Sequence, residues 1–186
     1  MSERIVYFMR GVYACGKSTR AKELAGDTGI VLEVDRYFEV PTEDGIKYLY
    51  REKDAPKALK HVYRELKRAM KLRINPIVMD WDCGLCAFDK KVMKRVIQSG
   101  YTPKIAEPKS ELWNTLRPMI ENKEHVDSNE FAEFAQKLFI LNQRTHGVSF
   151  EKIFKRIMEW QANVTIDDIL NYEEQFPTNQ KEWEFM

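Results

Sequence analysis

A ten-residue stretch near the start of the chain has the residue types and spacing of a phosphate-binding loop. Residues 10–19 read RGVYACGKST and match G-x-x-x-x-G-K-[ST] through Gly11, Gly16, Lys17 and Ser18. In such loops the glycines let consecutive backbone N–H groups face phosphate oxygens, the lysine bridges the β and γ phosphates, and the hydroxyl binds Mg²⁺. The pattern therefore predicts binding of ATP, or of another nucleoside triphosphate, with Mg²⁺.

The whole loop is predicted to contact the nucleotide. Its residues are Gly11, Val12, Tyr13, Ala14, Cys15, Gly16, Lys17, Ser18 and Thr19. Tyr13 and Ala14 stand between the fixed glycines, where Ala14 is strained only if its backbone φ angle is positive. We expect the loop to form around these two residues.

Two aspartates stand where the carboxylates of a phosphotransfer site are expected. Asp35 ends a predicted strand at residues 30–34, and Asp80 ends another at residues 77–79. In open α/β sheets, ligands bind beyond the carboxyl ends of the strands. A carboxylate there can accept a proton from an attacking hydroxyl, or hold Mg²⁺ directly or through water. The alternative is a helix cap or turn residue, which is the better description of Asp82.

Strands and helices alternate around these residues. Short apolar runs predict four buried strands, at residues 5–9, 30–34, 77–79 and 102–106. Apolar residues at helical spacing predict the helices between them, at residues 17–25, 54–73 and 89–100, with Asp89 as the cap of the last. This alternation predicts an α/β fold with a parallel sheet of four to five strands and helices on both faces.

The last part of the chain is predicted to be helical. Helices are expected at residues 110–116, stopped by Pro118, at residues 128–142 and at residues 149–161. Thr165 and Asp168 have the spacing of a capping box, which predicts a short final helix that ends before Pro177.

Composition excludes several classes of protein. The chain has 186 residues, a formal net charge of +1 and 44% hydrophobic residues, as expected of one soluble globular domain. It contains no apolar run long enough to cross a bilayer and no signal-peptide pattern. Three cysteines are an odd number, which favours reduced thiols without a disulfide partner. We expect a protein of the cytoplasm or nucleus that is neither secreted nor bound to a membrane.

Several motifs together resemble a known family. The chain is similar to P-loop kinases of the polynucleotide 5′-hydroxyl kinase branch, most closely to the kinase-like domain of the Nedd-four-binding-protein-two-like family. The resemblance runs to about residue 160 and rests on an ordered series of motifs: RGVYACGKST at 10–19, DRYF at 35–38, DG at 44–45, NPIVMD at 75–80, GY at 100–101, EP at 107–108, THGVS at 145–149 and EKI at 151–153.

The resemblance implies a fold and a division of roles. It implies a three-layer P-loop NTPase sandwich forming a single kinase domain over residues 1–186, with a sheet core at 1–108, a helical and lid region at 109–161, and a C-terminal helix and tail at 162–186. It also implies transfer of the γ-phosphate of ATP to a nucleic-acid 5′-hydroxyl. Lys17 and Ser18 would contact phosphate and metal, and Asp35 would be the general base. Arg144, beside the lid motif, is the expected lid cation.

The chain departs from the family on the acceptor side. Where these kinases usually carry Asp-Asn-Thr-Asn after the third strand, this chain reads DWDC at 80–83, and Phe38 stands where phage-type kinases carry an arginine. Two other functions therefore stay open: a kinase for a small-molecule hydroxyl, and a nucleotide-binding module without transfer. Trp81 could stack on a base or simply pack.

Two weaker signals concern nucleic acid and metal. A basic stripe on the helix at 54–73 could track a phosphate backbone or be a solvated face; it consists of Lys60, Arg64, Lys67, Arg68 and Lys71. Cys83 and Cys86 have the spacing of a zinc knuckle, but no second Cys/His pair accompanies them, so a zinc site is not expected.

Overall fold

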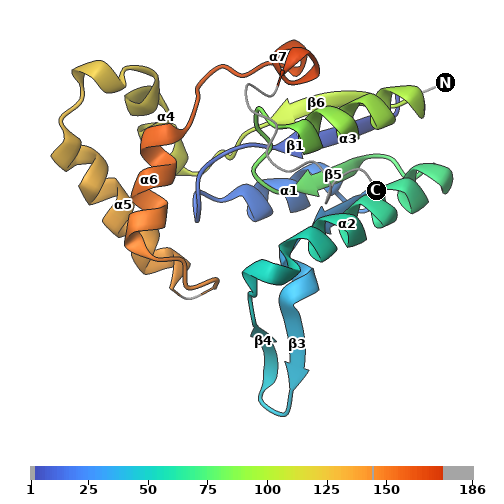
Figure 1. Cartoon of the computed structure of the whole chain (residues 1–186), viewed down its shortest axis with the longest axis horizontal. Helices are drawn as coiled ribbons and strands as arrows, with labels where there is room; N and C mark the ends of the chain where they lie inside the picture. Colours follow the sequence, from blue (N-terminus) through green and yellow to red (C-terminus); the bar gives the residue numbers. More distant parts are fainter. Residues whose placement is uncertain (1–2, 144, 174–186) are drawn as a thin grey trace.

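The central element is a four-stranded parallel sheet with strand order β2-β5-β1-β6 (Figure 1). The computed structural model of the chain describes residues 3–143 and 145–173. The strands are β1 (Ile5–Met9), β2 (Ile30–Glu33), β5 (Ile77–Asp80) and β6 (Thr102–Ala106). The predictions of an α/β fold and of a parallel sheet of four to five strands are confirmed.

The sheet is covered by helices on both faces. On β1, Val6 and Phe8 belong to one buried cluster, which also contains residues of α2 (Ala55–Lys71), α3 (Ala87–Gln98) and α7 (Ile166–Asn171). Met9 belongs to a cluster on the opposite face, with Ala21 and Ala25 of α1 (Lys17–Ala25). Because successive strand residues point to opposite faces and both faces are covered, β1 is apolar at every position.

A second core lies in the C-terminal helical part. Helices α4 (Glu111–Glu121), α5 (Ser128–Asn142) and α6 (Phe150–Glu159) lie side by side, at the left of Figure 1. Their fully buried side chains include Trp113 of α4 and Trp160 after α6, whose rings meet edge to face at 5.1 Å between centroids. Val12 and Cys15 of the predicted phosphate loop belong to the same cluster, so this core also supports the loop.

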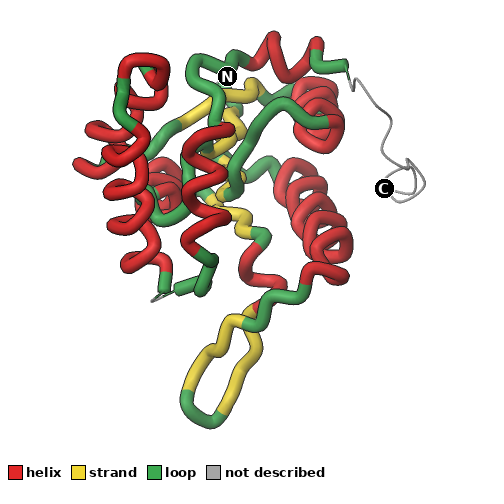
Figure 2. Tube along the Cα trace, turned by 60° about the vertical axis from the view of Figure 1, so that its left-hand side comes forward, coloured by secondary structure: helices red, strands yellow, loops and turns green. Residues whose placement is uncertain are grey.

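A β-hairpin that the sequence analysis did not predict projects from the domain (Figures 1 and 2). It consists of β3 (Glu39–Thr42) and β4 (Gly45–Tyr48), which pair antiparallel. A short 3₁₀ turn (Asp35–Phe38) leads into it, and another (Glu52–Asp54) leads from it to α2. The strands are mostly exposed, so no apolar face marks them in the sequence. The Asp-Gly pair at 44–45, typical of tight hairpin turns, is the signal that could have found them.

Two helix boundaries differ from the predictions. Pro118 does not stop α4, which continues to Glu121 because Ile120, beyond the proline, is buried in the second core and compensates for the lost backbone hydrogen bond. Asp89 does not cap α3. The cap is Cys86, whose sulfur accepts a bond from the Asp89 N–H, while the Asp89 carboxylate accepts the N–H of Gly84 at 2.8 Å.

The other helix predictions agree with the structure. Ser149 caps α6, and Thr165 and Asp168 form the predicted capping box at α7. Within residues 3–143 and 145–173, no helix has the length and apolar character needed to span a bilayer. The predicted tail lies outside the described residues from 174 onward.

Candidate active site

The loop between β1 and α1 requires glycine at both fixed positions. Gly11 has φ of 147°, and a Cβ atom there would lie 2.8 Å from Cys15 Sγ and 3.1 Å from Pro108 Cδ. Gly16 caps α1 in the left-handed region with φ of 96°. Ala14 also has a positive φ, of 53°, so it carries the strain that the sequence analysis made conditional on this angle.

Side chains from two other segments, and one from the loop itself, hold the loop in place. The Ser110 hydroxyl, at the start of α4, donates to the Cys15 carbonyl at 2.7 Å. The Cys15 thiol donates to the Val12 carbonyl at 2.9 Å, and the Gly11 N–H donates to Asp82 at 3.2 Å. Burial raises the pKa of Cys15 to about 11, so this thiol is a packing residue rather than a reactive one.

Asp82 joins the loop to the helical part. Besides accepting from Gly11, its carboxylate forms an ion pair with Arg156 of α6. Both side chains are partly shielded from solvent, which strengthens the pair. The sequence predicts a helix cap or turn residue at Asp82; in the structure its carboxylate instead anchors the loop to α6. Arg156 was not singled out, because nothing in its sequence context distinguishes it from other helix cations.

Lys17 and Ser18 lie at the start of α1, beside the end of β5. The Lys17 ammonium donates to the carbonyls of Gly11 at 2.9 Å and Val12 at 2.7 Å, so it lies over the loop. Ser18 hydrogen-bonds to the carboxylate of Asp80. Burial raises the pKa of Asp80, and this bond and the nearby Lys17 charge oppose the rise.

A hydroxyl beside one buried carboxylate is a set of donors that suits Mg²⁺. This ion takes oxygen ligands and commonly uses only one or two protein groups, with water and substrate phosphates as the rest. Ser18 and Asp80 provide two such oxygens next to the loop. Across residues 3–143 and 145–173 no group of three or more His, Cys, Asp or Glu side chains is arranged to hold a metal by itself, and Cys83 and Cys86 are free thiols.

The carboxylate of Asp35 is held by two residues from distant segments. The Tyr48 hydroxyl, at the end of β4, donates to Oδ1 at 3.0 Å. Nε2 of His146, from the connection between α5 and α6, lies 3.2 Å from Oδ2. Burial alone would raise the pKa of Asp35, but the bonds from His146 and Tyr48, with the His146 and Lys17 charges, outweigh it and lower the pKa below its ordinary value. Asp35 is therefore ionised at neutral pH.

The two partners of Asp35 are affected in turn. The hydrogen bond with Asp35 raises the pKa of His146, against the opposing effect of burial. Burial and the nearby Asp35 charge raise the pKa of the Tyr48 hydroxyl, which therefore stays a proton donor. The rings of Tyr48 and His146 meet edge to face at 4.8 Å between centroids. The sequence alone does not predict a role for either residue; the one signal is the position of His146 in the THGVS motif.

A single cleft brings most of the predicted site residues together. Its volume is about 450 Å³, and the predicted residues that line it are Tyr13, Ala14, Gly16, Lys17, Ser18, Thr19, Asp35 and Asp80. An adjoining cavity of about 410 Å³ shares Ser18, Asp35 and Asp80 and reaches the hairpin. Val12 and Cys15 support the loop from behind, because their side chains are buried in the second core. Arg144 lies outside the described residues.

The two aromatic departures from the family pack against other rings. Trp81 lines the cleft and contacts Phe8 and Phe88, with centroids 6.2 Å and 5.5 Å away. Phe38 is buried at the base of the hairpin against Tyr48 and Tyr50. Phe38 therefore stabilises the hairpin that carries Tyr48, instead of contributing a charge to the cleft.

The comparisons with known proteins assign no family. No protein-family model matches the chain, and no curated protein is significantly similar to it. The function of the site is therefore inferred from its geometry and from the resemblance of its motifs.

Proposed function

We propose that the chain is an ATP-dependent phosphotransferase of the P-loop kinase type that phosphorylates the 5′-hydroxyl of a polynucleotide. One observation carries the proposal: an ionised carboxylate, Asp35, held by two hydrogen bonds, lines the same cleft as Lys17, Ser18 and Asp80. A phosphate-binding loop with a carboxylate beyond the next strand is the arrangement that phosphoryl transfer to a hydroxyl needs.

The donor side consists of the loop and its neighbours. The backbone N–H groups between Gly11 and Thr19 and the ammonium of Lys17 bind the triphosphate of ATP. Lys17 exchanges its bonds to the loop carbonyls for phosphate oxygens, which are stronger, charged acceptors. Ser18 and Asp80 would hold Mg²⁺, and the ion would supply the positive charge that neutralises the phosphates.

The acceptor side centres on Asp35. Its carboxylate orients the acceptor hydroxyl and takes its proton as the hydroxyl oxygen bonds to the γ-phosphorus. The bond from that phosphorus to the β–γ bridging oxygen breaks, and ADP is released. Because phosphoryl transfer has a loose transition state, positioning matters more than base strength. A carboxylate with a lowered pKa, fixed by Tyr48 and His146, is suited to that role.

The helical part supplies the other wall of the cleft. Leu141, Asn142, Thr145, His146 and Val148, at and after the end of α5, line it opposite the loop. This placement supports a lid function for residues 109–161 within a three-layer P-loop fold. Arg144 belongs to the same segment of sequence and is proposed as the cation that contacts the transferring phosphoryl.

The acceptor class rests on the resemblance to polynucleotide kinases. Two of its motifs, DRYF at 35–38 and THGVS at 145–149, are far apart in the sequence and meet through the contact between Asp35 and His146. Motifs that resemble a family only by chance have no reason to share a contact in the cleft. This contact supports treating them as parts of one acceptor site.

A second candidate is a kinase for a small-molecule hydroxyl, and the lining of the adjoining cavity favours it. Besides Asp35 and Asp80, the cavity presents Glu33 and Glu39, whereas Lys22 is its only Lys or Arg among the described residues. Carboxylates repel the phosphates of a nucleic acid and attract a neutral or cationic acceptor. The volume, about 410 Å³, is also in the range of small-molecule sites.

Transfer of labelled γ-phosphate from ATP with Mg²⁺ tests these candidates. The acceptors are 5′-hydroxyl RNA and DNA oligonucleotides, assayed in parallel with a panel of nucleosides, sugars and amino-sugars. Asp35→Asn serves as the variant and Asp44→Asn, at the exposed hairpin turn, as its matched control. Label on the oligonucleotide end that is lost only in Asp35→Asn supports the proposal.

The other outcomes separate the alternatives. Label on a small molecule alone favours the second candidate. A rise in melting temperature with ATP, but no product on any acceptor, points to a nucleotide-binding module without transfer.

A further inference from the structure

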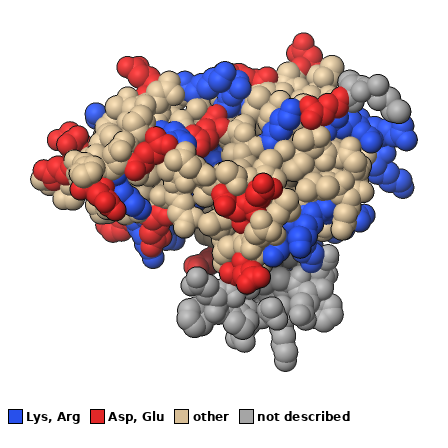
Figure 3. Space-filling model, turned by 90° about the horizontal axis from the view of Figure 1, so that it is seen from above, with Lys and Arg blue, Asp and Glu red and all other residues tan. Residues whose placement is uncertain are grey.

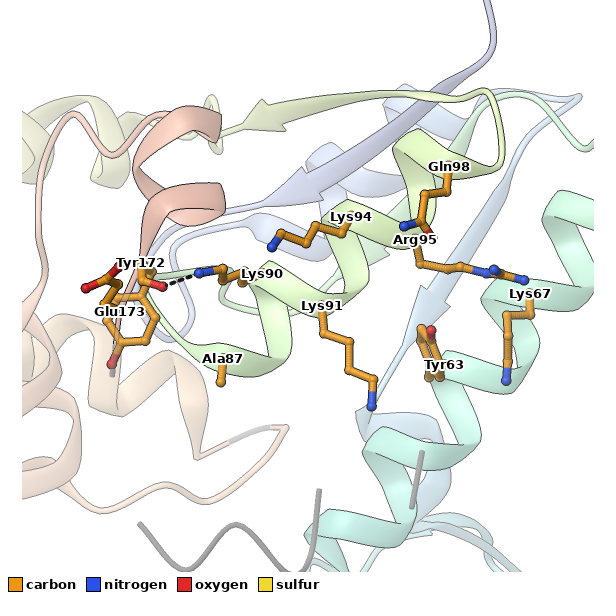
Figure 4. A pocket seen from close by; sticks show the side chains of 10 residues that line it. All are labelled: Tyr63, Lys67, Ala87, Lys90, Lys91, Lys94, Arg95, Gln98, Tyr172 and Glu173. Carbon is orange, nitrogen blue, oxygen red and sulfur yellow. Dashed lines mark hydrogen bonds between the residues drawn. The ribbon is translucent and has the colours of Figure 1, made fainter. Parts of the chain in front are cut away.

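A second hollow, away from the cleft, has five cationic side chains among the ten residues that line it. It has a volume of about 830 Å³ and lies between α2 and α3, on one covered face of the sheet (Figure 4). Its cationic side chains are Lys67 of α2 and Lys90, Lys91, Lys94 and Arg95 of α3. Glu173 is the one carboxylate that lines it within the described residues. We call this feature the basic groove.

The cations of α3 form two rows along the helix. Lys90 and Lys94 are four residues apart, as are Lys91 and Arg95, so neighbouring charges in a row are separated by about 6 Å. Like charges at this spacing repel and destabilise an isolated helix. Lys67 adds a positive charge from the facing helix (Figure 4). A linear polyanion with regularly spaced charges would relieve this repulsion along the whole row.

Two tyrosines line the groove, Tyr63 as a buried side chain of the core and Tyr172 as a partly exposed one. Tyr63 is covered by the ammonium of Lys67, 4.7 Å above its ring, and Tyr172 stands at the opposite end beside Lys90 (Figure 4). The Lys90 ammonium donates to the Tyr172 carbonyl at 2.7 Å, which fixes both residues at that end. Cations that line a groove together with aromatic rings are the combination that binds single-stranded nucleic acid.

The basic groove begins near the cleft. Ala87, the first residue of α3, lines the groove, and its neighbour Phe88 packs on Trp81, which lines the cleft. The groove then follows α3 towards Gln98, at the end away from the phosphate loop. In the space-filling view Lys and Arg side chains gather at the right-hand end of the molecule, where Figure 1 places the far ends of α2 and α3 (Figure 3).

We propose that the basic groove binds the sugar–phosphate backbone of a single-stranded acceptor, several nucleotides from its 5′ end; this inference rests on the proposed function. The acidic cavity beside Asp35 then receives only the terminal nucleoside, which carries a hydroxyl and no 5′-phosphate. The backbone charge is bound elsewhere, on α2 and α3. The groove thereby allows a site lined with carboxylates to use a polyanionic substrate.

The test is binding of a fluorescent 20-nucleotide single strand, without ATP, followed by anisotropy over a range of salt concentrations. The groove variant is Lys94→Glu with Arg95→Glu, both exposed residues of α3. The matched control, Lys137→Glu with Lys155→Glu on α5 and α6, changes the net charge by the same amount. We expect the groove variant to bind at least about tenfold more weakly, with a log–log salt slope shallower by about 1.4, or about 0.7 for each lost phosphate contact.

Transfer assays separate this inference from the proposed function. With a dinucleotide acceptor, the groove variant is expected to transfer phosphate as efficiently as the wild type. The wild type is expected to use a 20-nucleotide acceptor more efficiently than the dinucleotide, and the groove variant is expected to lose this preference. Binding that depends on the groove without transfer to any acceptor would overturn the proposed function and leave the groove site standing. Equal affinity and salt slope in the groove variant and the control would overturn the groove site, as would displacement of the strand by a polyglutamate peptide of equal charge.

Discussion

The carboxylate of Asp35 lies 3.2 Å from Nε2 of His146, which joins the end of the second strand to the connection between α5 and α6. The same carboxylate accepts the hydroxyl of Tyr48 from the hairpin. Three segments that are separate in the sequence therefore fix one acidic group at the edge of the cleft.

The contact predicts how His146 titrates. Its pKa is raised above 6.5 because Asp35 stabilises the protonated ring. NMR titration of the ring should show this elevation. Asp35→Asn should return the pKa to about 6.5 or below, because the variant removes the hydrogen bond and charge of Asp35 that oppose the effect of burial. Asp44→Asn should leave the titration unchanged. An unshifted pKa in the wild type would contradict the contact.

The same contact predicts a pH dependence of stability. The pKa of His146 is higher in the folded state than in the unfolded state, so its pair with Asp35 stabilises the fold fully below pH 6.5. This contribution declines as the pH rises through the pKa of His146 in the folded state. Wild type and His146→Gln should therefore differ most in melting temperature near pH 5.5 and converge by about pH 9. Because both side chains are partly exposed, we expect a difference below about 1 kcal/mol. A gap that widens with rising pH would contradict this.

Replacement of Lys17 by alanine should abolish transfer and preserve the fold. We expect a loss of at least about 100-fold in kcat, the usual effect of removing one group that stabilises transition-state charge. Circular dichroism and the melting temperature without nucleotide should stay close to wild type, because Lys17 bonds to two loop carbonyls and its side chain belongs to none of the hydrophobic core clusters. Arg20→Ala, on the same helix but outside the lining of both the cleft and the adjoining cavity, is the control for loss of a charge. Unchanged turnover in Lys17→Ala would exclude the loop as the donor site.

Replacement of Ala14 by glycine is expected not to destabilise the protein. At φ of 53° an alanine is strained by about 1–2 kcal/mol, which glycine relieves. In urea denaturation, Ala14→Gly should leave the free energy of unfolding unchanged or raise it by up to about 1 kcal/mol. Ala132→Gly, inside α5, should lower it by about 1 kcal/mol. Equal losses in the two variants would show that the backbone at Ala14 is unstrained.

The cysteines should resist modification in the folded protein. Burial raises the pKa of Cys15 to about 11 and that of Cys86 to about 12, so almost no thiolate is present at pH 7.5. An aromatic disulfide reagent should react slowly with the native protein and rapidly with three thiols after denaturation. Fast reaction of one native thiol would place that cysteine outside the core.

The sequence was informative where a local pattern has one physical meaning. The apolar run at 5–9 and the glycines at 11 and 16 predicted a buried strand and a phosphate loop because few other structures tolerate those residues in that order. Asp35 and Asp80 were found by their position after strands.

Other features depend on contacts that no local pattern encodes. Tyr48 reaches Asp35 only because β4 of the hairpin ends beside it, and Arg156 reaches Asp82 only because α6 packs in the same core as the loop. Pro118 stays helical because tertiary packing of Ile120 overrides the local preference.

The predicted phosphate loop is shared between two halves of the molecule: it joins β1 to α1 of the sheet half, while its residues Val12 and Cys15 are buried among α4, α5 and α6. Local unfolding of these helices therefore cannot leave the loop intact, and by thermodynamic reciprocity a ligand on the loop must protect the helices. Amide hydrogen exchange in α5 and α6 should therefore slow when a ligand binds to the loop, although these helices lie outside it. Fluctuations of the helical half would set how often the cleft is ready to receive its substrate.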